Sequence, residues 1–367
     1  MGYRSDVVGS LLRPRYLKDA RRQHESSQLT EGEFKKIEDH AVDEAVALQE
    51  RAGLDVVSDG ELRRYAFYGH LIEAVEGFDM LGGWAIPFRN EAGETLVLQR
   101  PVVVSKLRRR RHLCAEEFTY LRARTNRTAK VTLISAQQAA SYYDPRKSAG
   151  AYFDIDGYLS DLVDIMKEEV AELVRLGCRY IQIDSPQYAG LVDAEIREGY
   201  RQRGNDPDRL LDLAMEMDNA VIGDHPGVLF GLHMCRGNNR SRFYASGGYE
   251  PIARIFRQTR FHRFLLEYDD ARSGGFEPLA AVPEDRTVVL GLVSTKRAQL
   301  ENRDELKRRI EQASRFVPLD RLAVSPQCGF ASTLEGNEIA ESDQEAKLRL
   351  VAQLAREVWG GAASVNF

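Results

Sequence analysis

The sequence predicts an α/β fold, a (β/α)8 TIM barrel, from two features that run along all 367 residues. Eight short segments are apolar and rich in β-branched residues, and each ends in polar or small residues. Near-continuous apolar runs of this kind are typical of parallel strands that are buried on both faces. Helical patterns lie between these segments. Alternating β and α units, repeated eight times, predict a parallel barrel surrounded by helices.

The eight expected strands are spread over the whole chain. They cover Asp6–Ser10, Leu54–Glu61, Lys130–Ser135, Tyr180–Pro186, Val228–Cys235, Phe264–Asp270, Val288–Thr295 and Leu322–Cys328. In barrels of this class the catalytic groups lie at the carboxyl ends of the strands. A polar residue that ends a strand is therefore a candidate site residue, whereas one on a helix is expected to be structural.

Four segments have clear helical patterns. Glu31–Gly53 and Gly157–Cys178 repeat their apolar residues with a period of 3.6, and Glu31–Gly53 closes on a glycine cap. Arg303–Val317 and Ser342–Trp359 follow the seventh and eighth expected strands. The last helix is expected to begin with a Ser-x-x-Glu capping box.

One stretch, Gly77–Pro101, interrupts the alternation after the second expected strand. We expect an inserted hairpin or lid there. The chain contains no evident linker, low-complexity segment or short-period repeat. Residues 1–367 are therefore expected to form a single barrel domain, with residues 77–101 inserted within it.

The composition favours an ordinary globular protein that acts on small molecules. Hydrophobic residues make up 43% of the chain, and the net charge of −5 gives no reason to expect nucleic acid or an anionic membrane as a partner. No apolar run approaches the roughly 20 residues that a membrane span needs. Four cysteines in a chain of this length do not form a disulfide framework. We expect a cytoplasmic protein with reduced thiols, and the sequence leaves a homo-oligomer open.

Four candidate metal ligands end three of the expected strands. His233 and Cys235 end the fifth strand, and their spacing places both side chains on one face, about 6.6 Å apart along the chain. Glu267 lies near the end of the sixth strand and Cys328 ends the eighth. Two thiolates, an imidazole and a carboxylate at one barrel mouth form a credible tetrahedral set for Zn²⁺.

Each of these residues also has a simpler interpretation. An isolated His-x-Cys pair fits ordinary core packing, a single cysteine at a strand end is commonly a small buried apolar group, and Glu267 could pair with an arginine. The convergence of all four on one face favours the zinc site. Cys114 and Cys178 fail the position test, because neither ends a strand.

The ligand types indicate thiol chemistry. Two thiolates and a carboxylate give the site a net negative charge, which makes zinc a weak activator of water. Such a site favours a soft thiol, which the metal deprotonates. The bound sulfur is then a nucleophile suited to an sp³ carbon. The incoming sulfur must displace a protein ligand or expand the shell, and the carboxylate of Glu267 is the expected ligand to yield.

Seven motifs resemble the cobalamin-independent methionine synthase family, namely its catalytic C-terminal barrel and its shorter single-barrel relatives. In chain order they are VGSLLRP, SDGELRR, IQIDSP, HMCRGN, FLLEYDD, GLVSTK and SPQCGFAST, and together they span almost the whole chain. The resemblance implies that the four candidate ligands, which are His233, Cys235, Glu267 and Cys328, bind catalytic zinc.

The resemblance also implies where an amino-acid substrate binds. Gly9 and Ser10 would hold its carboxylate through backbone groups, and Glu61 and Asp184 would hold its ammonium group. Both acids end expected strands, so their positions agree with the barrel rule. The alternative for Glu61 and Asp184 is a pair of ion-paired carboxylates on the barrel rim.

The chain departs from the family on the side that binds the folate. The family carries an acidic residue where this chain has Gly190, and a tryptophan where it offers Tyr142 and Tyr143. It also carries a histidine at a position where this chain has Val293 or Lys296. Full-length members also have a further N-terminal barrel. The residues for zinc and the amino acid are thus retained, whereas those for folate are not.

We therefore expect zinc-dependent transfer of a methyl or other alkyl group to a thiol, which forms a thioether, as in methionine biosynthesis. Homocysteine is the leading thiol, and the alkyl donor is open. The alternative is thiol addition to an epoxide, as in epoxyalkane:coenzyme M transferases. A non-catalytic zinc or thiol-binding protein is the third class.

The alternatives require different groups. An epoxide opener needs an acid, for which Tyr65, Tyr68, Tyr142 or Tyr143 could serve. A sulfonated thiol needs a cation, and the candidates are Arg13, Arg63 and Arg236. An acidic pair argues instead for an amino-acid thiol.

Overall fold

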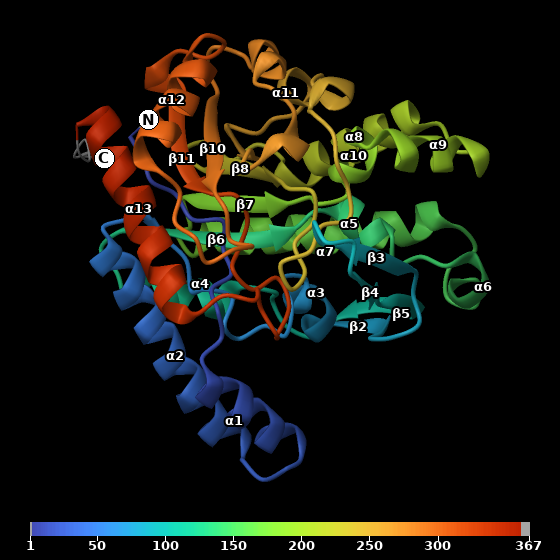
Figure 1. Ribbon diagram of the computed structural model, residues 1–367. Coiled ribbons are helices and arrows are strands. Elements are labelled where there is room, and N and C mark those ends of the chain that lie inside the picture. Colours follow the sequence, from blue (N-terminus) through green and yellow to red (C-terminus); the bar gives the residue numbers. More distant parts are fainter. Residues whose placement is uncertain (1, 361–367) are drawn as a thin grey trace.

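The computed structural model describes residues 2–360, and its centre is a curled, seven-stranded parallel sheet (Figure 1). The strand order is β1-β6-β7-β8-β9-β10-β11. The strands are β1 (Val56–Val57), β6 (Thr128–Ile134), β7 (Tyr180–Asp184), β8 (Leu229–Met234), β9 (Arg263–Glu267), β10 (Thr287–Val293) and β11 (Leu322–Pro326). Each matches one of the expected strands, although β1 is much shorter than expected. Sequence neighbours thus lie side by side, and their carboxyl ends meet at one edge.

The expected strand at Asp6–Ser10 is not a regular strand in the structure. Ser5 forms an isolated parallel bridge with Val324 of β11, and Leu11 N–H donates to the Gly60 carbonyl at 2.9 Å. The carbonyls between these points accept from side chains instead of from a strand: Lys130 donates to Val7, Gln182 to Val8 and Ser58 to Gly9. Side-chain donors therefore replace the ladder that an eighth strand would need.

Most of the helices lie between strands in sequence, whereas α1 and α2 precede the sheet and α13 follows it; α1 packs on α2 and extends away from the sheet (Figure 1). The helices are α1 (Arg15–Glu25), α2 (Glu31–Ala52), α3 (Gly69–Ala74), α4 (Ala115–Arg122), α5 (Ala136–Ala140), α6 (Pro145–Ser148), α7 (Ile155–Arg175), α8 (Tyr188–Val192), α9 (Ala194–Gln202), α10 (Pro207–Ile222), α11 (Ile255–Gln258), α12 (Arg303–Ser314) and α13 (Glu341–Trp359). Short 3₁₀ helices cover Glu250–Ile252, Ala271–Ser273, Glu277–Ala281 and Leu319–Arg321. Within residues 2–360, no helix combines the length and the apolar character needed to cross a membrane.

The caps of the long helices follow local sequence with one exception. Thr30 and Glu33 form a reciprocal capping box at the start of α2, and Gly53 ends the helix with φ of 89°. The capping box expected from Ser342 and Glu345 is wrong. Helix α13 begins earlier, and the Asp343 carboxylate accepts from the backbone N–H of Ala340 at 2.9 Å.

The insertion after the second expected strand contains two antiparallel strand pairs and extends beyond the expected residues 77–101. Strands β2 (Val75–Asp79) and β5 (Val102–Arg109) pair antiparallel, and between them β3 (Ala85–Arg89) pairs antiparallel with β4 (Thr95–Gln99). The whole unit lies between β1 and β6 in the chain. Phe88, Leu98 and Arg100 of this unit line the cavity that also contains His233 and Cys235.

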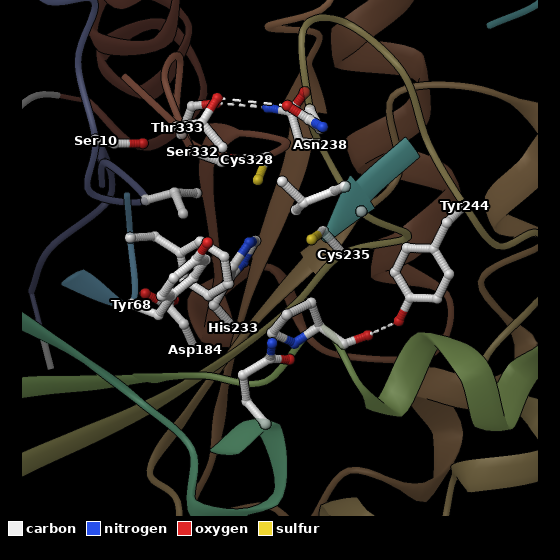
Figure 2. A pocket seen from close by; sticks show the side chains of 18 of the residues that line it. Ser10, Tyr68, Asp184, His233, Cys235, Asn238, Tyr244, Cys328, Ser332 and Thr333 are labelled. Carbon is white, nitrogen blue, oxygen red and sulfur yellow. Dashed lines mark hydrogen bonds between the residues drawn. The ribbon is translucent and has the colours of Figure 1, made fainter. Parts of the chain in front are cut away.

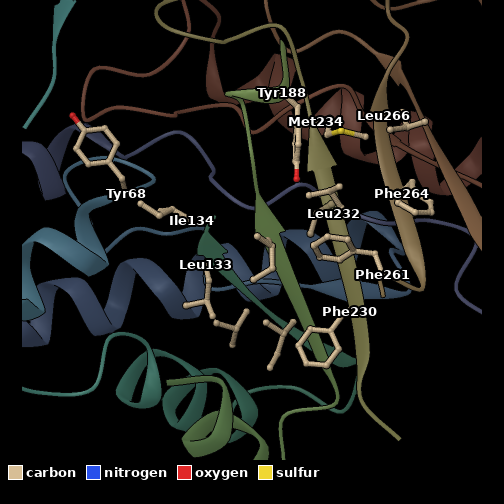
Figure 3. Packing of buried hydrophobic residues seen from close by; sticks show 14 of the residues in the cluster. Tyr68, Leu133, Ile134, Tyr188, Phe230, Leu232, Met234, Phe261, Phe264 and Leu266 are labelled. Atoms are coloured by element: carbon tan, nitrogen blue, oxygen red, sulfur yellow. The ribbon is translucent and has the colours of Figure 1, made fainter. Parts of the chain in front are cut away.

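Alternation along β8 separates the apolar core from the polar interior. Phe230, Leu232 and Met234 belong to the main hydrophobic cluster, in which Leu266 of β9 also packs (Figure 3). Each such side chain contributes about 1.5–3 kcal/mol when it is fully buried. Because successive residues of a strand face opposite sides, His233 points away from this cluster. The packing of the apolar face thus fixes the direction of the candidate ligand.

Candidate metal and thiol site

Three of the four expected metal ligands converge at the carboxyl ends of the strands. His233 lies in β8, Cys235 follows the end of β8, and Cys328 follows β11. One ligand atom from each lies within 4.8 Å of the others, and all three residues are buried. Figure 2 shows the two sulfurs and the imidazole ring directed toward a common space. One soft metal ion fits this donor set.

The contacts of His233 leave one ring nitrogen for a metal. Nδ1 lies 3.2 Å from the backbone oxygen of Leu265, and an oxygen acceptor requires the proton to be on Nδ1. Nε2 is buried and has no hydrogen-bond partner among the described residues. A backbone acceptor on one nitrogen and a free lone pair on the other is the usual arrangement of a metal-binding histidine.

The two thiols influence each other. The hydrogen bond from Cys328, together with His233, holds the pKa of Cys235 well below its usual range. The same neighbour, Cys235, raises the pKa of Cys328. The lowered pKa of Cys235 favours its thiolate form, which is the form of cysteine that binds a metal.

Glu267, the fourth expected ligand, lies outside this three-residue group. It ends β9 and is fully buried. Its Oε2 accepts from the backbone N–H of Arg236 at 2.6 Å, whereas Oε1 lies 3.3 Å from Arg272 Nη2 and 3.4 Å from Lys296 Nζ. The carboxylate is thus neutralised by two cations of the protein.

The two expected substrate acids, Glu61 and Asp184, line the cavity into which the ligand group faces. Asp184 ends β7 and is paired in register with His233 of β8. Burial raises the pKa of Asp184 to about 7. Glu61 accepts from Thr132 Oγ1 at 2.8 Å through Oε1, while its Oε2 is buried without a partner among residues 2–360. Both acids line the same cavity as His233.

Gly9 and Ser10 lie beside these acids. A Cβ built on Gly9 would be 2.5 Å from Glu61 Oε1, so only glycine allows the chain to approach this closely. The Ser10 carbonyl accepts from the Phe330 N–H at 2.8 Å, and Ser10 lines the cavity. The N-terminal segment is thereby fixed between Glu61 and the segment that follows Cys328.

The cavity extends from the ligand group toward the inserted hairpin and encloses about 720 Å³, including the part that opens to solvent. Its lining combines the ligands and acids with aromatic, amide and hydroxyl side chains (Figure 2). The lining residues that the sequence analysis did not single out include Phe67, Phe88, Leu98, Arg100, Gln138, Asn238 and Tyr244. Phe88, Leu98 and Arg100 belong to the insertion, which contains none of the seven motifs, so the sequence analysis did not identify them.

Most of the tyrosines and arginines that were candidates for an acid or a cation do not line the cavity. Of the four candidate tyrosines, only Tyr68 lines the cavity. None of the three candidate arginines does, because each is occupied elsewhere. Arg13 donates to backbone carbonyls, Arg63 pairs with Asp39, and Arg236 donates to the Gly247 carbonyl.

Comparison with known proteins agrees with these features. Residues 5–355 match the family described as the catalytic domain of cobalamin-independent synthase. The uncharacterised proteins YxjH and YxjG of Bacillus subtilis are 36% and 37% identical over 362 and 371 residues, which cover 97% of this chain and 95% of each relative. A methionine synthase from Pyrococcus abyssi is 26% identical over 331 residues, or 89% of this chain and 86% of that protein.

Solved structures share the fold over the full length. A Listeria monocytogenes protein, assigned provisionally as a vitamin-B12-independent methionine synthase, is 27% identical with a TM-score of 0.74, and the match covers 98% of both chains. A B12-independent methionine synthase from Shewanella, 20% identical with a TM-score of 0.76 and the same coverage, supports the fold alone. The chain belongs to the cobalamin-independent methionine synthase family.

Proposed function

We propose that the protein transfers a methyl or other alkyl group to the sulfur of a thiol while Zn²⁺ is bound at the strand ends. The observation that carries this proposal is the buried group of His233, Cys235 and Cys328, whose ligand atoms lie within 4.8 Å of one another. Membership of a methyltransferase family supports the reaction class. Zinc bound there would hold the acceptor thiol as a thiolate and keep its sulfur nucleophilic.

The donor set fits zinc on independent grounds. The Nε2 atom of His233 is an orphaned buried nitrogen, and the two cysteine sulfurs are soft ligands. Such an atom costs free energy while it has no partner, which a metal relieves. We propose Glu267 as the fourth ligand. Lys296 and Arg272 can hold its carboxylate whenever the sulfur of the substrate takes that ligand position.

We propose homocysteine as the thiol, because the cavity offers acids for its ammonium group. Glu61 has a buried carboxylate oxygen without a partner, and Asp184 lies beside His233. Backbone groups of Gly9 and Ser10 would hold the substrate carboxylate. The positions of these four residues would present the thiol to the ligand group.

The proposal also covers the type of group transferred, the domain architecture and the cellular compartment. The relative from Pyrococcus abyssi is a methionine synthase, which favours methyl transfer over thiol addition to an epoxide. We propose that the N-terminal segment closes the sheet into a TIM barrel, that residues 1–367 form one domain, and that the inserted hairpin acts as a lid.

Four free cysteines support a reducing cytoplasmic setting.

Zinc content and methyl transfer test this proposal together. The purified protein should hold close to one zinc per chain, and Cys235→Ser and Cys328→Ser should both lower that content and abolish alkylation of homocysteine. Cys178→Ser is the matched control, since Cys178 is buried but donates to the Tyr180 carbonyl away from the ligand group. Zinc content that survives both site substitutions would overturn the metal assignment.

A further inference from the structure

Arg100 is a buried cation that faces the cavity. It lies between β4 and β5 of the insertion and is only 6% exposed. Its side chain is part of the cavity lining, together with the metal-ligand group and both substrate acids. No part of the proposed thiol alkylation, as described so far, uses this residue.

The guanidinium has little to neutralise it. Its Nη1 donates to the Ser141 hydroxyl, which is neutral. Among residues 2–360, no carboxylate oxygen lies within the 4.0 Å of a salt bridge with Arg100. A buried charge without a counterion is energetically unfavourable. A ligand that brings an anionic group would remove this cost.

Other buried arginines show what a satisfied guanidinium looks like in this protein. Arg64 pairs with Glu117 at 2.6 Å, and Arg263 lies 3.4 Å from Asp6. Arg13 donates to several backbone carbonyls, including those of Glu61 and Arg64. Arg100 differs from all three, since it faces a cavity and has one neutral partner.

The backbone around Arg100 is held in place. Its N–H donates to the Trp84 carbonyl at 3.1 Å, and its own carbonyl accepts from the Gly83 N–H at 2.9 Å. A Cβ on Gly83 would lie 2.2 Å from the Pro101 oxygen, so this close approach requires glycine. The insertion therefore presents Arg100 at a fixed position and does not leave it on a free loop.

The surroundings of Arg100 in the cavity are aromatic. Phe67, Tyr68, Phe88 and Tyr244 all line the same space. These rings offer apolar faces, whereas the two acids, Glu61 and Asp184, carry the negative charge of the lining. The cavity thus combines an acidic side that suits an ammonium group with a cationic site amid aromatic rings.

We propose that Arg100 binds an anionic group of the alkyl donor, and that this donor is an anion with an aromatic or otherwise apolar body. This inference rests on the proposed alkyl transfer, because only that reaction makes the anionic ligand an alkyl donor. Guanidinium binds carboxylate and other oxyanions through paired N–H donors, which gives orientation as well as affinity. Arg100 would thereby set the distance between the donor and the ligand group.

Benzoate and benzamide are suitable probes, because they share one aromatic body and differ in charge. Ligand-observed NMR titration of the zinc-loaded protein measures both dissociation constants. Benzoate should bind at least about tenfold more weakly to Arg100→Gln than to the unaltered protein, with an intermediate effect in Arg100→Lys. Benzamide should bind all three alike, which shows that the cavity is intact. Arg89→Gln, an exposed arginine of the same hairpin, should change neither.

A second titration in saturating homocysteine identifies the source of the anion. If Arg100 serves the donor, benzoate binds in the presence of homocysteine; displacement would assign Arg100 to the thiol's carboxylate and overturn the proposal. Equal benzoate affinity in Arg100→Gln, or no binding to the unaltered protein, would also overturn it. Failure of homocysteine to bind, with Arg100-dependent benzoate binding retained, would contradict the proposed thiol and support the anion site.

Discussion

Asp184 and His233 are paired in register on the adjacent parallel strands β7 and β8. Neighbouring strands are about 4.8 Å apart, so one candidate substrate acid lies a single strand spacing from a candidate metal ligand. The proposed amino-acid site and metal site therefore share one rigid pair of strands.

His233→Ala should weaken zinc binding, because it removes the only nitrogen of the three-residue group. We expect the variant to lose zinc to a chelator concentration that the unaltered protein withstands. Metal content after dialysis measures this. His262→Ala is the control, since His262 lies at the amino end of β9 and its Nδ1 accepts from the Phe230 N–H. Equal zinc retention in the two variants would contradict the assignment of His233.

Asp184→Asn should weaken the binding of homocysteine by about tenfold or more, because a charged partner of its ammonium group is lost. Binding of 4-mercaptobutanoate, which lacks the amine, should stay within about twofold of the unaltered protein. Calorimetric titration with both thiols provides the comparison.

Asp218→Asn serves as the matched control for Asp184→Asn. Asp218 is also a buried carboxylate, but it accepts from the Tyr188 hydroxyl at 2.8 Å and does not line the cavity. Its substitution should leave both thiol affinities unchanged. An equal loss of affinity for the two thiols in Asp184→Asn would show that Asp184 does not bind the ammonium group.

Gly9→Ala should displace Glu61, because the new Cβ would lie 2.5 Å from Glu61 Oε1 and 2.9 Å from Thr132 Cγ2. We expect weaker homocysteine binding with unchanged zinc content. Gly32→Ala in α2 is the control: no atom lies within 4 Å of its Cβ, and alanine in a helix stabilises by about 0.5–1 kcal/mol. Unchanged thiol affinity in Gly9→Ala would show that this close approach is not needed for binding.

Asp218 should make the protein less stable as the pH rises. Burial raises the pKa of Asp218 to about 7, above its ordinary value of 3.8. Between these two values the folded state binds more protons than the unfolded state, so the free energy of unfolding falls with rising pH, by at most about 1.4 kcal/mol per pH unit for one group. Above pH 7 this loss is complete.

Urea unfolding of the unaltered protein and of Asp218→Asn at pH 4, 5, 6 and 7 tests this linkage. Asparagine cannot ionise, so the stability of Asp218→Asn relative to that of the unaltered protein should increase from pH 4 to pH 7. A difference between the two proteins that is independent of pH would exclude Asp218 as the source.

Local sequence patterns predicted most of the strands and the three converging ligands. The apolar run before His233 makes β8 a buried strand, and the spacing of two residues places His233 and Cys235 on one face. The rule that strand ends meet at one edge then brings in Cys328. Both steps depend only on strand periodicity and on parallel topology, which neighbouring residues encode.

The segment at Asp6–Ser10 shows where such local patterns fail. Its apolar residues suit a strand, yet its carbonyls accept from three side chains that come from distant parts of the chain. Hydrogen bonding of a backbone segment is a property of its neighbours in space. The pattern of apolar residues within this five-residue segment cannot indicate which distant side chains donate to its carbonyls.

The sequence by itself determined the family, the strand ends, and the ligand types that favour thiol chemistry. Only the tertiary structure decided which charges are neutralised. It places Lys296 and Arg272 against Glu267, commits the three expected arginines to other partners, and leaves Arg100 facing the cavity. The physical reason is that the cost of a buried charge depends on groups within a few ångströms, and folding brings these from distant segments.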